Sequence, residues 1–281
     1  MPESPVSAEA FARAVIHIAQ QRDRGPVVVK LGGSAMEDPA ATDACLRSVA
    51  VLNHLGVPLV LVHGGGKPID RAMAAAGLVP KKVAGRRYTD DATLRIVVKV
   101  LLAIGDDIAT RLTAFGCPAQ RSSNSLHGRR LNLTGANGES IDLGHVGEVT
   151  RFTPFEAATV AVIPSIATDD SGNLLNINAD TAASAVAGAL QAGKAIFLTD
   201  TPGVLRDRRD PASLIPKLTE TECRSLIAEG VIEGGMVPKV EACFEALSAG
   251  AKSALILDGR EPFSLLSVFL HDTFSGTEIT K

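Results

Sequence analysis

The chain has little cysteine and no strong excess of charge of either sign. Its four cysteines, Cys45, Cys117, Cys223 and Cys243, lie far apart, with no Cys-x-x-Cys pair and no neighbouring histidine cluster. This spacing favours neither a zinc site nor a disulfide framework, so reduced thiols are the simplest interpretation. A net charge of −3 gives no basic field of the kind that nucleic-acid and membrane-surface binders present. We therefore expect a small-molecule partner, with no nucleic acid and no membrane.

Also absent is any apolar run that approaches the roughly 20 residues needed to span a bilayer. The N-terminus is acidic and polar, unlike a secretory leader, in which a basic region precedes an apolar one. We therefore expect a cytoplasmic protein. With 281 residues, 46% hydrophobic and 21% charged, the chain can bury a substantial core in one large domain or two lobes.

Two apolar stretches that run out into glycine are the strongest pattern present. Residues 27–34 read Val-Val-Val-Lys-Leu-Gly-Gly-Ser, and residues 58–67 read Pro-Leu-Val-Leu-Val-His-Gly-Gly-Gly-Lys. Each is typical of a buried strand of a parallel sheet followed by a turn whose backbone amides can approach an anion. Because open α/β sheets bind ligands at the carboxyl ends of their strands, both turns are candidate binding sites.

Strands and helices alternate along the rest of the chain, which predicts an α/β fold with an open, mainly parallel sheet sandwiched by helices. We expect polar hairpins over 122–147 and a boundary between two lobes near residue 190. The expected helices span 7–24, with Ser7 as N-cap, and 43–55, 67–76, 91–115, 179–190, 219–230, 236–249 and 262–270. Further strands are expected at 57–62, 160–163, 194–199 and 253–257.

Two lysines are candidates for chemistry. Lys30 closes a buried strand beside Gly32 and Gly33, which directs its ammonium into the crevice, whereas a lone lysine would be only a solvated strand end. Lys239 stands at a helix start just after Met236, where a cation opposes the helix dipole unless an anion is bound nearby. That local conflict indicates a site.

The segment Asn176-Ile-Asn-Ala-Asp180 places three short polar side chains at a strand-to-helix junction. Capping by Asn178 and compensation of the helix dipole by Asp180 would be worth about 1 kcal/mol each. Capping does not need Asn176, and three such groups together also suit a substrate carboxylate and a neighbouring cation. The residues leave both interpretations open and favour function.

The glycines after His63 give consecutive amides at a helix start, which suits a carboxylate or phosphate, although a tight turn explains them too. His63 itself is predicted to be a hydrogen-bonded turn residue and not a base, because no carboxylate near in sequence is placed to orient it. Arg86 and Arg87 offer a guanidinium fork, the natural partner of a carboxylate.

The segment 188–194, Gly-Ala-Leu-Gln-Ala-Gly-Lys, imitates a phosphate-binding P-loop. Ala195 occupies the Ser/Thr position, and the segment ends a helix where a P-loop would follow a strand, so the required context is missing. We interpret Gly193 as a helix C-cap and Lys194 as the start of a strand. Any nucleotide site must be built differently.

Taken together and in order, these motifs resemble the amino-acid kinase family over about residues 25–280. The segments at Arg87 and at Asn176–Asp180 point to the branch whose members phosphorylate N-acetyl-L-glutamate in arginine biosynthesis. The resembling segments are residues 30–33, 63–66, 85–90, 142–150, 176–180, 198–205 and 234–239.

The resemblance implies transfer of the γ-phosphoryl group of ATP to the side-chain carboxylate of the acceptor, with Mg²⁺ carried by the nucleotide and no metal site of the protein's own. The attacking carboxylate is already ionised, so no general base is required. On this reading Lys30 and Lys239 are catalytic and flank the transferred group. Asp180 lies between them and fixes both ammonium groups.

The resemblance also implies the binding residues. Arg87 and Asn176, with Asn178 beside them, would hold the acceptor, while the amides of Gly65 and Gly66 meet its reacting carboxylate. The implied nucleotide-binding residues are Gly32, Gly33, Thr199, Asp200, Gly203, Gly235 and Met236.

The family likeness also predicts how the chain is divided into lobes and how it assembles. Residues 1–24 would form an N-terminal helical extension, residues 25–190 an acceptor-binding lobe with the dimer interface, and residues 191–281 a nucleotide-binding lobe. A homodimer is expected. The N-terminal helix is in the position used to interlace dimers into arginine-inhibited hexamers, which makes a hexamer the further possibility.

Two departures from the family pattern bear on acceptor and regulation. Residues 124–128, Asn-Ser-Leu-His-Gly, lack a lysine that the family carries near the acceptor, and the tail at 270–277 is shorter than the family's arginine-sensing tail. The alternative function is a related kinase for an aminoadipate-type or other acylated amino acid. In a different class, a non-catalytic amino-acid sensor predicts an eroded charge set, yet Lys30, Asp180 and Lys239 are all present.

Overall fold

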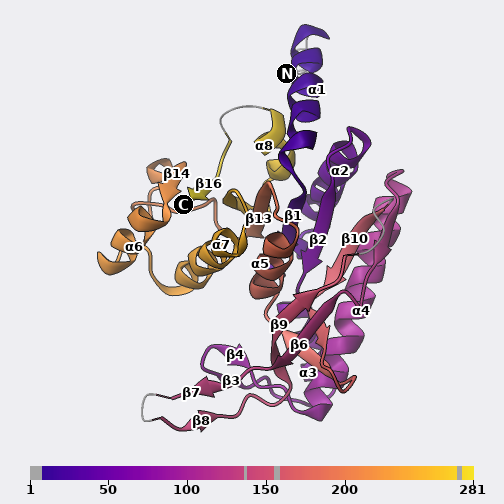
Figure 1. Ribbon diagram of the computed structural model, residues 1–281, viewed down its shortest axis with the longest axis vertical. Helices are drawn as coiled ribbons and strands as arrows, with labels where there is room; N and C mark the ends of the chain where they lie inside the picture. Colours follow the sequence, from indigo (N-terminus) through magenta and orange to yellow (C-terminus); the bar gives the residue numbers. More distant parts are fainter. Residues whose placement is uncertain (1–7, 136–137, 155–158, 271–273) are drawn as a thin grey trace.

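The framework of the molecule is one eight-stranded sheet, seen in a computed structural model that describes residues 8–135, 138–154, 159–270 and 274–281 (Figure 1). The strand order is β14-β16-β15-β13-β1-β2-β10-β5. All neighbours are parallel except β15 and β16, which run antiparallel. The predicted α/β class with a mainly parallel sheet is confirmed.

The sheet is built from strands β1 (Val27–Leu31), β2 (Leu59–His63), β5 (Ala119–Arg121), β10 (Val160–Pro164), β13 (Lys194–Thr199), β14 (Lys217–Thr219), β15 (Ala254–Asp258) and β16 (Thr277–Thr280). The helices are α1 (Ala8–Gln21), α2 (Pro39–His54), α3 (Gly66–Ala75), α4 (Asp91–Ala114), α5 (Ala179–Ala189), α6 (Glu220–Ala228), α7 (Val237–Ala249) and α8 (Ser264–Leu270).

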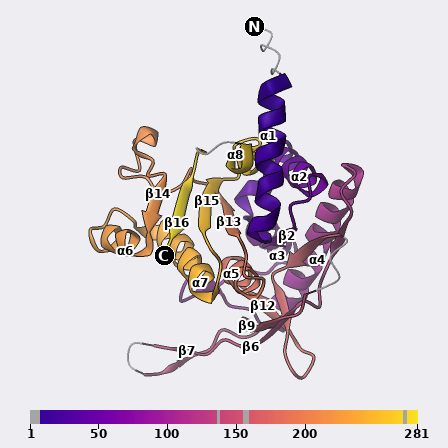
Figure 2. The ribbon, with the colours of Figure 1, turned by 45° about the horizontal axis from the view of Figure 1, so that its top comes forward.

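Helices cover both faces of the sheet, and the period-two alternation of each strand decides which face a side chain meets. Val27, Val29 and Leu31 of β1 pack with residues of α2, α4 and α8. Val28 packs on the opposite face with residues of α5 and α7, and the same alternation gives Lys30 to that face. The two faces are visible in Figures 1 and 2.

The predicted hairpins between residues 122 and 147 are present. Strands β6 (Leu126–Arg130), β9 (Val146–Phe152), β11 (Ile166–Thr168) and β12 (Leu174–Ile177) close into a small barrel below the main sheet. The ribbon of β7 (Leu133–Thr134) and β8 (Ser140–Ile141) projects from the body (Figure 2). A second short ribbon, β3 (Lys82–Val83) with β4 (Arg86–Arg87), precedes α4.

Two local predictions were wrong, the start of α2 and the helix cap at Gly193, and some strands were missed. Helix α2 begins at Pro39, four residues earlier than expected, because the Asp38 side chain caps it by accepting from the Ala40 N–H at 2.8 Å. Strands β5, β14 and β16 of the main sheet were not predicted, since each has only three or four residues.

Gly193 is not the C-cap of α5. That helix ends at Ala189, and Gln191 takes the left-handed conformation with φ of 49°. Gly193 is needed for another reason: a Cβ there would lie 2.6 Å from the carbonyl oxygen of Arg24.

Helix α1 divides its apolar side chains between the protein and solvent. Ile18 is buried against the core, whereas Phe11 and Ile16 are 66% and 58% exposed. The predicted cap Ser7 and part of the tail, residues 271–273, lie outside the described residues. Within the described chain, none of the helices has the length and apolar character needed to cross a membrane.

Candidate active site

Two cavities open near the carboxyl ends of the central strands. The first has a volume of about 290 Å³ and is walled by the glycine turn after β2, the β3–β4 ribbon and the start of α5. The second, of about 370 Å³, is enclosed by the segment after β13 and by the turn before α7. Lys30 and Asp180 line the first cavity, whereas Lys239 and Asp200 line the second.

Lys30 is held at the wall of the first cavity by Asp180. Its face of β1 is turned to α5, and Asp180 is the second residue of that helix. The Asn178 side-chain oxygen caps α5 by accepting from the Asp180 and Thr181 N–H groups at 2.9 and 3.1 Å. Lys30 Nζ lies 2.7 Å from Asp180 Oδ1, and the two side chains are only 12% and 25% exposed. The capped helix therefore presents a fixed carboxylate to a fixed ammonium.

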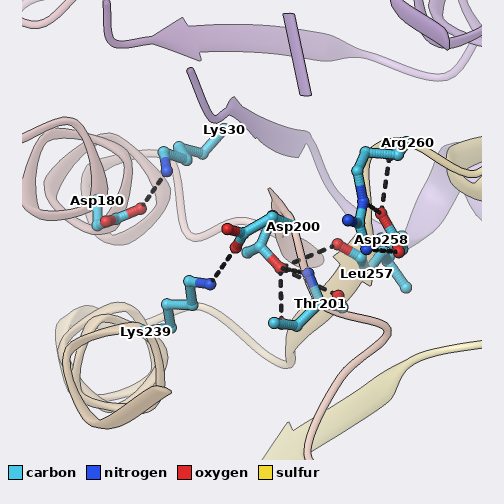
Figure 3. A network of polar contacts seen from close by, with 9 residues as sticks. Lys30, Asp180, Asp200, Thr201, Lys239, Leu257, Asp258 and Arg260 are labelled. Carbon is cyan, nitrogen blue, oxygen red and sulfur yellow. Dashed lines mark hydrogen bonds and ion pairs between the residues drawn. The ribbon is translucent and has the colours of Figure 1, made fainter. Parts of the chain in front are cut away.

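Lys239 is held by a different carboxylate. Its Nζ lies 2.7 Å from Oδ1 of Asp200, the residue after β13, and this hydrogen bond holds the pKa of the Asp200 carboxyl below its usual value. The expectation that Asp180 fixes both ammonium groups is therefore wrong. The reason is that the Lys239 side chain extends toward the end of β13, where Asp200 lies within ion-pair distance. Figure 3 shows the two lysines entering from opposite sides, each with its own carboxylate.

Arg87 lies across the first cavity from α5. Its Nη2 is 2.6 Å from Asp70 Oδ1 and also donates to the Gly66 carbonyl at 3.3 Å, and its Nη1 is 3.2 Å from Met73 Sδ. These three contacts all come from α3. They fix the guanidinium on one side and leave donors that can meet a carboxylate in the cavity.

Lys82 is a cavity residue that the sequence reasoning missed. In the β3–β4 ribbon it lies directly opposite Arg87, and both residues line the first cavity. Directly opposed like charges are destabilising unless an anion lies between them. The signal was present, because basic residues stand on both sides of Ala84-Gly85, whose φ angles of 48° and 74° make the tight turn.

The asparagines have separate tasks in the structure. Asn176 Nδ2 donates to Thr89 Oγ1 at 3.0 Å, and Thr89 Oγ1 donates in turn to the Arg87 carbonyl at 2.9 Å. Asn178 also lines the first cavity, with its side-chain oxygen used for the cap of α5. Asn176 is thus tied to the backbone of Arg87, and the two face one cavity.

The glycine amides gather at the same place. Gly33, Gly65 and Gly66 line the first cavity, whereas Gly32 is buried and lines neither cavity. Glycine at position 65 avoids a close contact, because a Cβ there would lie 2.9 Å from Leu101 Cδ2 of α4. As the N-cap of α3, it presents the positive end of a helix to the cavity.

The second cavity contains four of the predicted nucleotide-binding residues, Asp200, Gly203, Gly235 and Met236. Thr199 is not on its surface: it is buried at the end of β13, where its Oγ1 accepts from the Thr201 N–H at 3.1 Å. Lining residues that sequence reasoning did not single out are Val231, Ile232 and Arg208. No spacing in the sequence marks them, because they come from loops between short elements.

The described part of the chain has no group of three or more His, Cys, Asp or Glu side chains suited to a metal ion. Three carboxylates line the two cavities, and each is paired with a cation: Asp180 with Lys30, Asp200 with Lys239, and Glu233 with Arg208.

Comparisons with known proteins agree with this geometry. Residues 25–258 match the sequence profile of the amino acid kinase family. An acetylglutamate kinase from Thermosynechococcus vestitus is 41% identical over 258 residues, which cover 89% of this chain and 86% of that protein. One from Trichodesmium erythraeum is 38% identical over 286 residues, covering 99% and 96%.

Among solved structures, an N-acetylglutamate synthase from Neisseria gonorrhoeae in complex with coenzyme A and N-acetyl-glutamate superposes with a TM-score of 0.82 at 24% identity. The alignment covers 99% of this chain, which spans only 64% of the length of that synthase. The same synthase with coenzyme A and L-arginine gives a TM-score of 0.80 at 25% identity, covering 99% and 66%. A carbamate kinase from Giardia lamblia shares the fold, with a TM-score of 0.62 at 18% identity and coverage of 92% and 98%. By its profile match, its curated relatives and its fold, this chain belongs to the amino acid kinase family.

Proposed function

We propose that the chain transfers the γ-phosphoryl group of ATP to the side-chain carboxylate of N-acetyl-L-glutamate, giving an acyl phosphate and ADP in arginine biosynthesis. One observation carries the proposal: two lysine–aspartate pairs, Lys30–Asp180 and Lys239–Asp200, stand one on each cavity with N–O distances of 2.7 Å. Curated relatives that carry the name acetylglutamate kinase support it. One cation on each of two cavities suits a reaction that must join two anions.

The acceptor is assigned to the first cavity. Arg87, fixed by Asp70 at 2.6 Å, binds the α-carboxylate through its remaining donors, and Asn176 completes that contact. The Gly65 and Gly66 amides meet the reacting carboxylate at the start of α3. Asn178 contributes chiefly by capping α5 and so placing Asp180.

The nucleotide is assigned to the second cavity, between the segment after β13 and the turn before α7. Asp200, Gly203, Gly235 and Met236 line it, with Val231 beside them. Gly33, on the turn after β1, contributes to the phosphate side, whereas Gly32 is buried, and the buried Thr199 supports the segment after β13 by accepting from the Thr201 N–H. Residues 25–190 are then the acceptor-binding lobe and residues 191–281 the nucleotide-binding lobe, joined through the pairing of β1 with β13.

Catalysis in this scheme is positioning and charge neutralisation. The acceptor carboxylate is already ionised, so the protein moves no proton. Lys30 neutralises charge on the oxygens of the moving phosphoryl group, and Lys239 does the same on the leaving side. Each cation should be worth about 4 kcal/mol of barrier, as for other cations in phosphoryl transfer.

Mg²⁺ carried by the nucleotide would supply further neutralisation of phosphate charge. Asp180 and Asp200 are the carboxylates that would hold it from the protein side. Their first task, on the contacts described, is to hold the two lysines.

We place the reaction in the cytoplasm and propose a homodimer as the basic assembly, with α1 as the element through which dimers join into a hexamer. The exposed Phe11 and Ile16 of α1 support that use of the helix. Mass measurement in solution decides between the two assemblies.

L-arginine is a candidate regulator, because a solved relative is a complex that contains it. A third cavity of about 400 Å³ at the foot of α1 has mixed charge suited to an amino acid. It is lined by Lys194 and Glu278, which are 3.7 Å apart, and by Asp23, Arg24 and Lys252. Inhibition of the wild-type activity by L-arginine supports this site, and an unaffected dimer contradicts it.

The function is tested by measuring ADP release with a panel of acceptors. N-acetyl-L-glutamate should be the best substrate by at least tenfold over aminoadipate derivatives, glutamate and aspartate. Preference for an acylated aminoadipate would replace the acceptor assignment. Binding of acetylglutamate and ATP without ADP release would favour a sensor instead.

A further inference from the structure

His63 is the last residue of β2 and lies beneath the glycine turn of the first cavity. Its side chain is wholly buried and belongs to the face of the sheet that α4 covers. Gly105 of α4 makes room for it: a Cβ at that position would lie 3.1 Å from His63 Nε2 and 2.8 Å from the Cδ of Arg121. The ring is therefore enclosed and does not reach the cavity itself.

The hydrogen bonding of this ring is one-sided. Nδ1 lies 3.2 Å from the carbonyl oxygen of Gly64, and a carbonyl can only accept, so Nδ1 carries the proton. Nε2 is buried and has no hydrogen-bond partner among the described residues. Burial and the nearby Arg121 lower the pKa of His63 to about 4, which keeps the ring neutral. An apolar side chain would avoid the cost of the unpaired nitrogen, so the bond to Gly64 needs an explanation.

The geometry of the peptide bond explains why His63 binds the Gly64 carbonyl. In a trans peptide the C=O of one residue and the N–H of the next point in opposite directions. If the Gly64 carbonyl is held toward the buried imidazole, the Gly65 N–H is turned away from it, toward the cavity that both glycines line. No described acceptor receives the Gly65 N–H, so it is free for a ligand.

Other restraints on this peptide are weak. The Gly64 N–H donates to the Leu31 carbonyl at a long 3.4 Å, whereas the firmer bonds, Ser165 N–H to His63 O at 3.1 Å and Ile69 N–H to Gly65 O at 2.8 Å, hold the ends of the turn. Glycine backbones rotate readily. The imidazole is thus the one side chain that acts on the orientation of the Gly64–Gly65 peptide in the described structure.

We infer that His63 is a positioning residue: its Nδ1–H fixes the Gly64–Gly65 peptide so that the Gly65 amide points at the reacting carboxylate of the acceptor. The inference rests on the proposed function and deepens it, because it explains how a flexible glycine turn becomes a fixed anion site. Preorganised amide donors of this kind stabilise developing charge without reorganisation.

Three substitutions separate positioning from packing. In His63→Asn, the side-chain amide nitrogen is attached at the same carbon as Nδ1 and can restore the bond to Gly64. In His63→Gln the amide lies near the Nε2 position, and in His63→Leu no donor remains. We expect kcat to fall about 10²-fold in the Gln and Leu variants, as for loss of one oxyanion donor, and less than tenfold in Asn. The KM for ATP should stay within about twofold in all three, since ATP is bound by the other cavity.

Thermal unfolding of each variant accompanies the kinetics. If Asn loses as much kcat as Leu at equal melting temperature, or if Gln and Leu keep the wild-type kcat, the inference is wrong. The imidazole tautomer, read by ¹⁵N NMR on the full chain at pH 7, is independent of the reaction. If the ring carries its proton on Nδ1 but the protein does not phosphorylate acetylglutamate, the proposed function is refuted while the hydrogen bond from His63 to Gly64 stands. If the ring carries its proton on Nε2 alone, or is charged, the inferred role of His63 is wrong.

Discussion

The two cavities each hold a lysine in place with an aspartate, but the elements that carry these residues differ. Each presents one lysine paired with one aspartate at 2.7 Å. In the first cavity the lysine stands on a central strand and the aspartate on a capped helix, with side chains 12% and 25% exposed. In the second, the aspartate belongs to a loop and is 54% exposed. A pair built on a strand and a helix is fixed by the core, whereas a pair built on a loop is free to change partners when a ligand arrives.

The largest effect should come from breaking the fixed pair. Lys30→Ala and Asp180→Asn should each lower kcat about 10³-fold or more while the chain stays folded, because the first removes the cation that neutralises the moving phosphoryl group and the second removes the carboxylate that holds this cation in place. Steady-state kinetics and circular dichroism check this. Lys99→Ala, at an exposed position on α4, is the matched control and should leave kcat unchanged. Near-normal turnover in either site variant would remove Lys30–Asp180 from the mechanism.

A buried imidazole, that of His63, lies beneath the glycine turn of the first cavity, and it should make stability depend on pH. The pKa of His63 falls from 6.5 to about 4 on folding, so between these values the unfolded chain binds the proton more tightly. The free energy of unfolding should therefore be greatest above pH 6.5 and fall as the pH is lowered toward 4, by about 3 kcal/mol. Urea titrations of wild type and His63→Asn across this range check it. If the free energy of unfolding depends on pH equally in the two proteins, His63 is not the group responsible.

The acceptor side of the first cavity is tested next. Arg87→Lys should raise the KM for acetylglutamate about 30-fold, roughly 2 kcal/mol, because a lysine cannot reproduce the planar fork held by Asp70. The KM for ATP should not change. Arg95→Lys, at an exposed position on α4, is the control. Equal changes in the KM values for acetylglutamate and ATP would mean that Arg87 does not act on the acceptor alone.

The smallest effect should come from the loop pair. Asp200→Asn should lower kcat/KM for ATP about tenfold, since a half-exposed partner is replaced in part by water. An effect as large as that of Asp180→Asn would mean that the Lys239–Asp200 pair contributes as much as the Lys30–Asp180 pair. Kinetics of both variants at one salt concentration make the comparison direct.

The same contrast explains what could be predicted from sequence. Lys30, the glycines after His63 and the Asn178 cap follow from strand period, turn composition and capping, which are local rules. The partner of Lys239 could not be predicted, because it depends on how α7 packs near the end of β13. Lys82 and Arg208 were missed for related reasons: one faces Arg87 only through a short ribbon, and the other enters the second cavity from a loop.

The contacts seen in the structure differ from those that the family resemblance implies. The resemblance gave Asp180 both lysines, and the contacts give it one. Thr199 and Gly32 were predicted to bind the nucleotide, but both are buried and neither lines the second cavity. Motifs identify segments that matter, whereas side-chain direction within a segment comes from packing.

The central claim is that a phosphoryl group passes from the second cavity to a carboxylate in the first. The most direct measurement traps the product with hydroxylamine, which converts an acyl phosphate to a hydroxamate. With ATP, Mg²⁺ and N-acetyl-L-glutamate, the account predicts hydroxamate and ADP in equal amounts, and neither product with N-acetyl-L-glutamine, which lacks the side-chain carboxylate. ADP without hydroxamate, or no ADP at all, would contradict it.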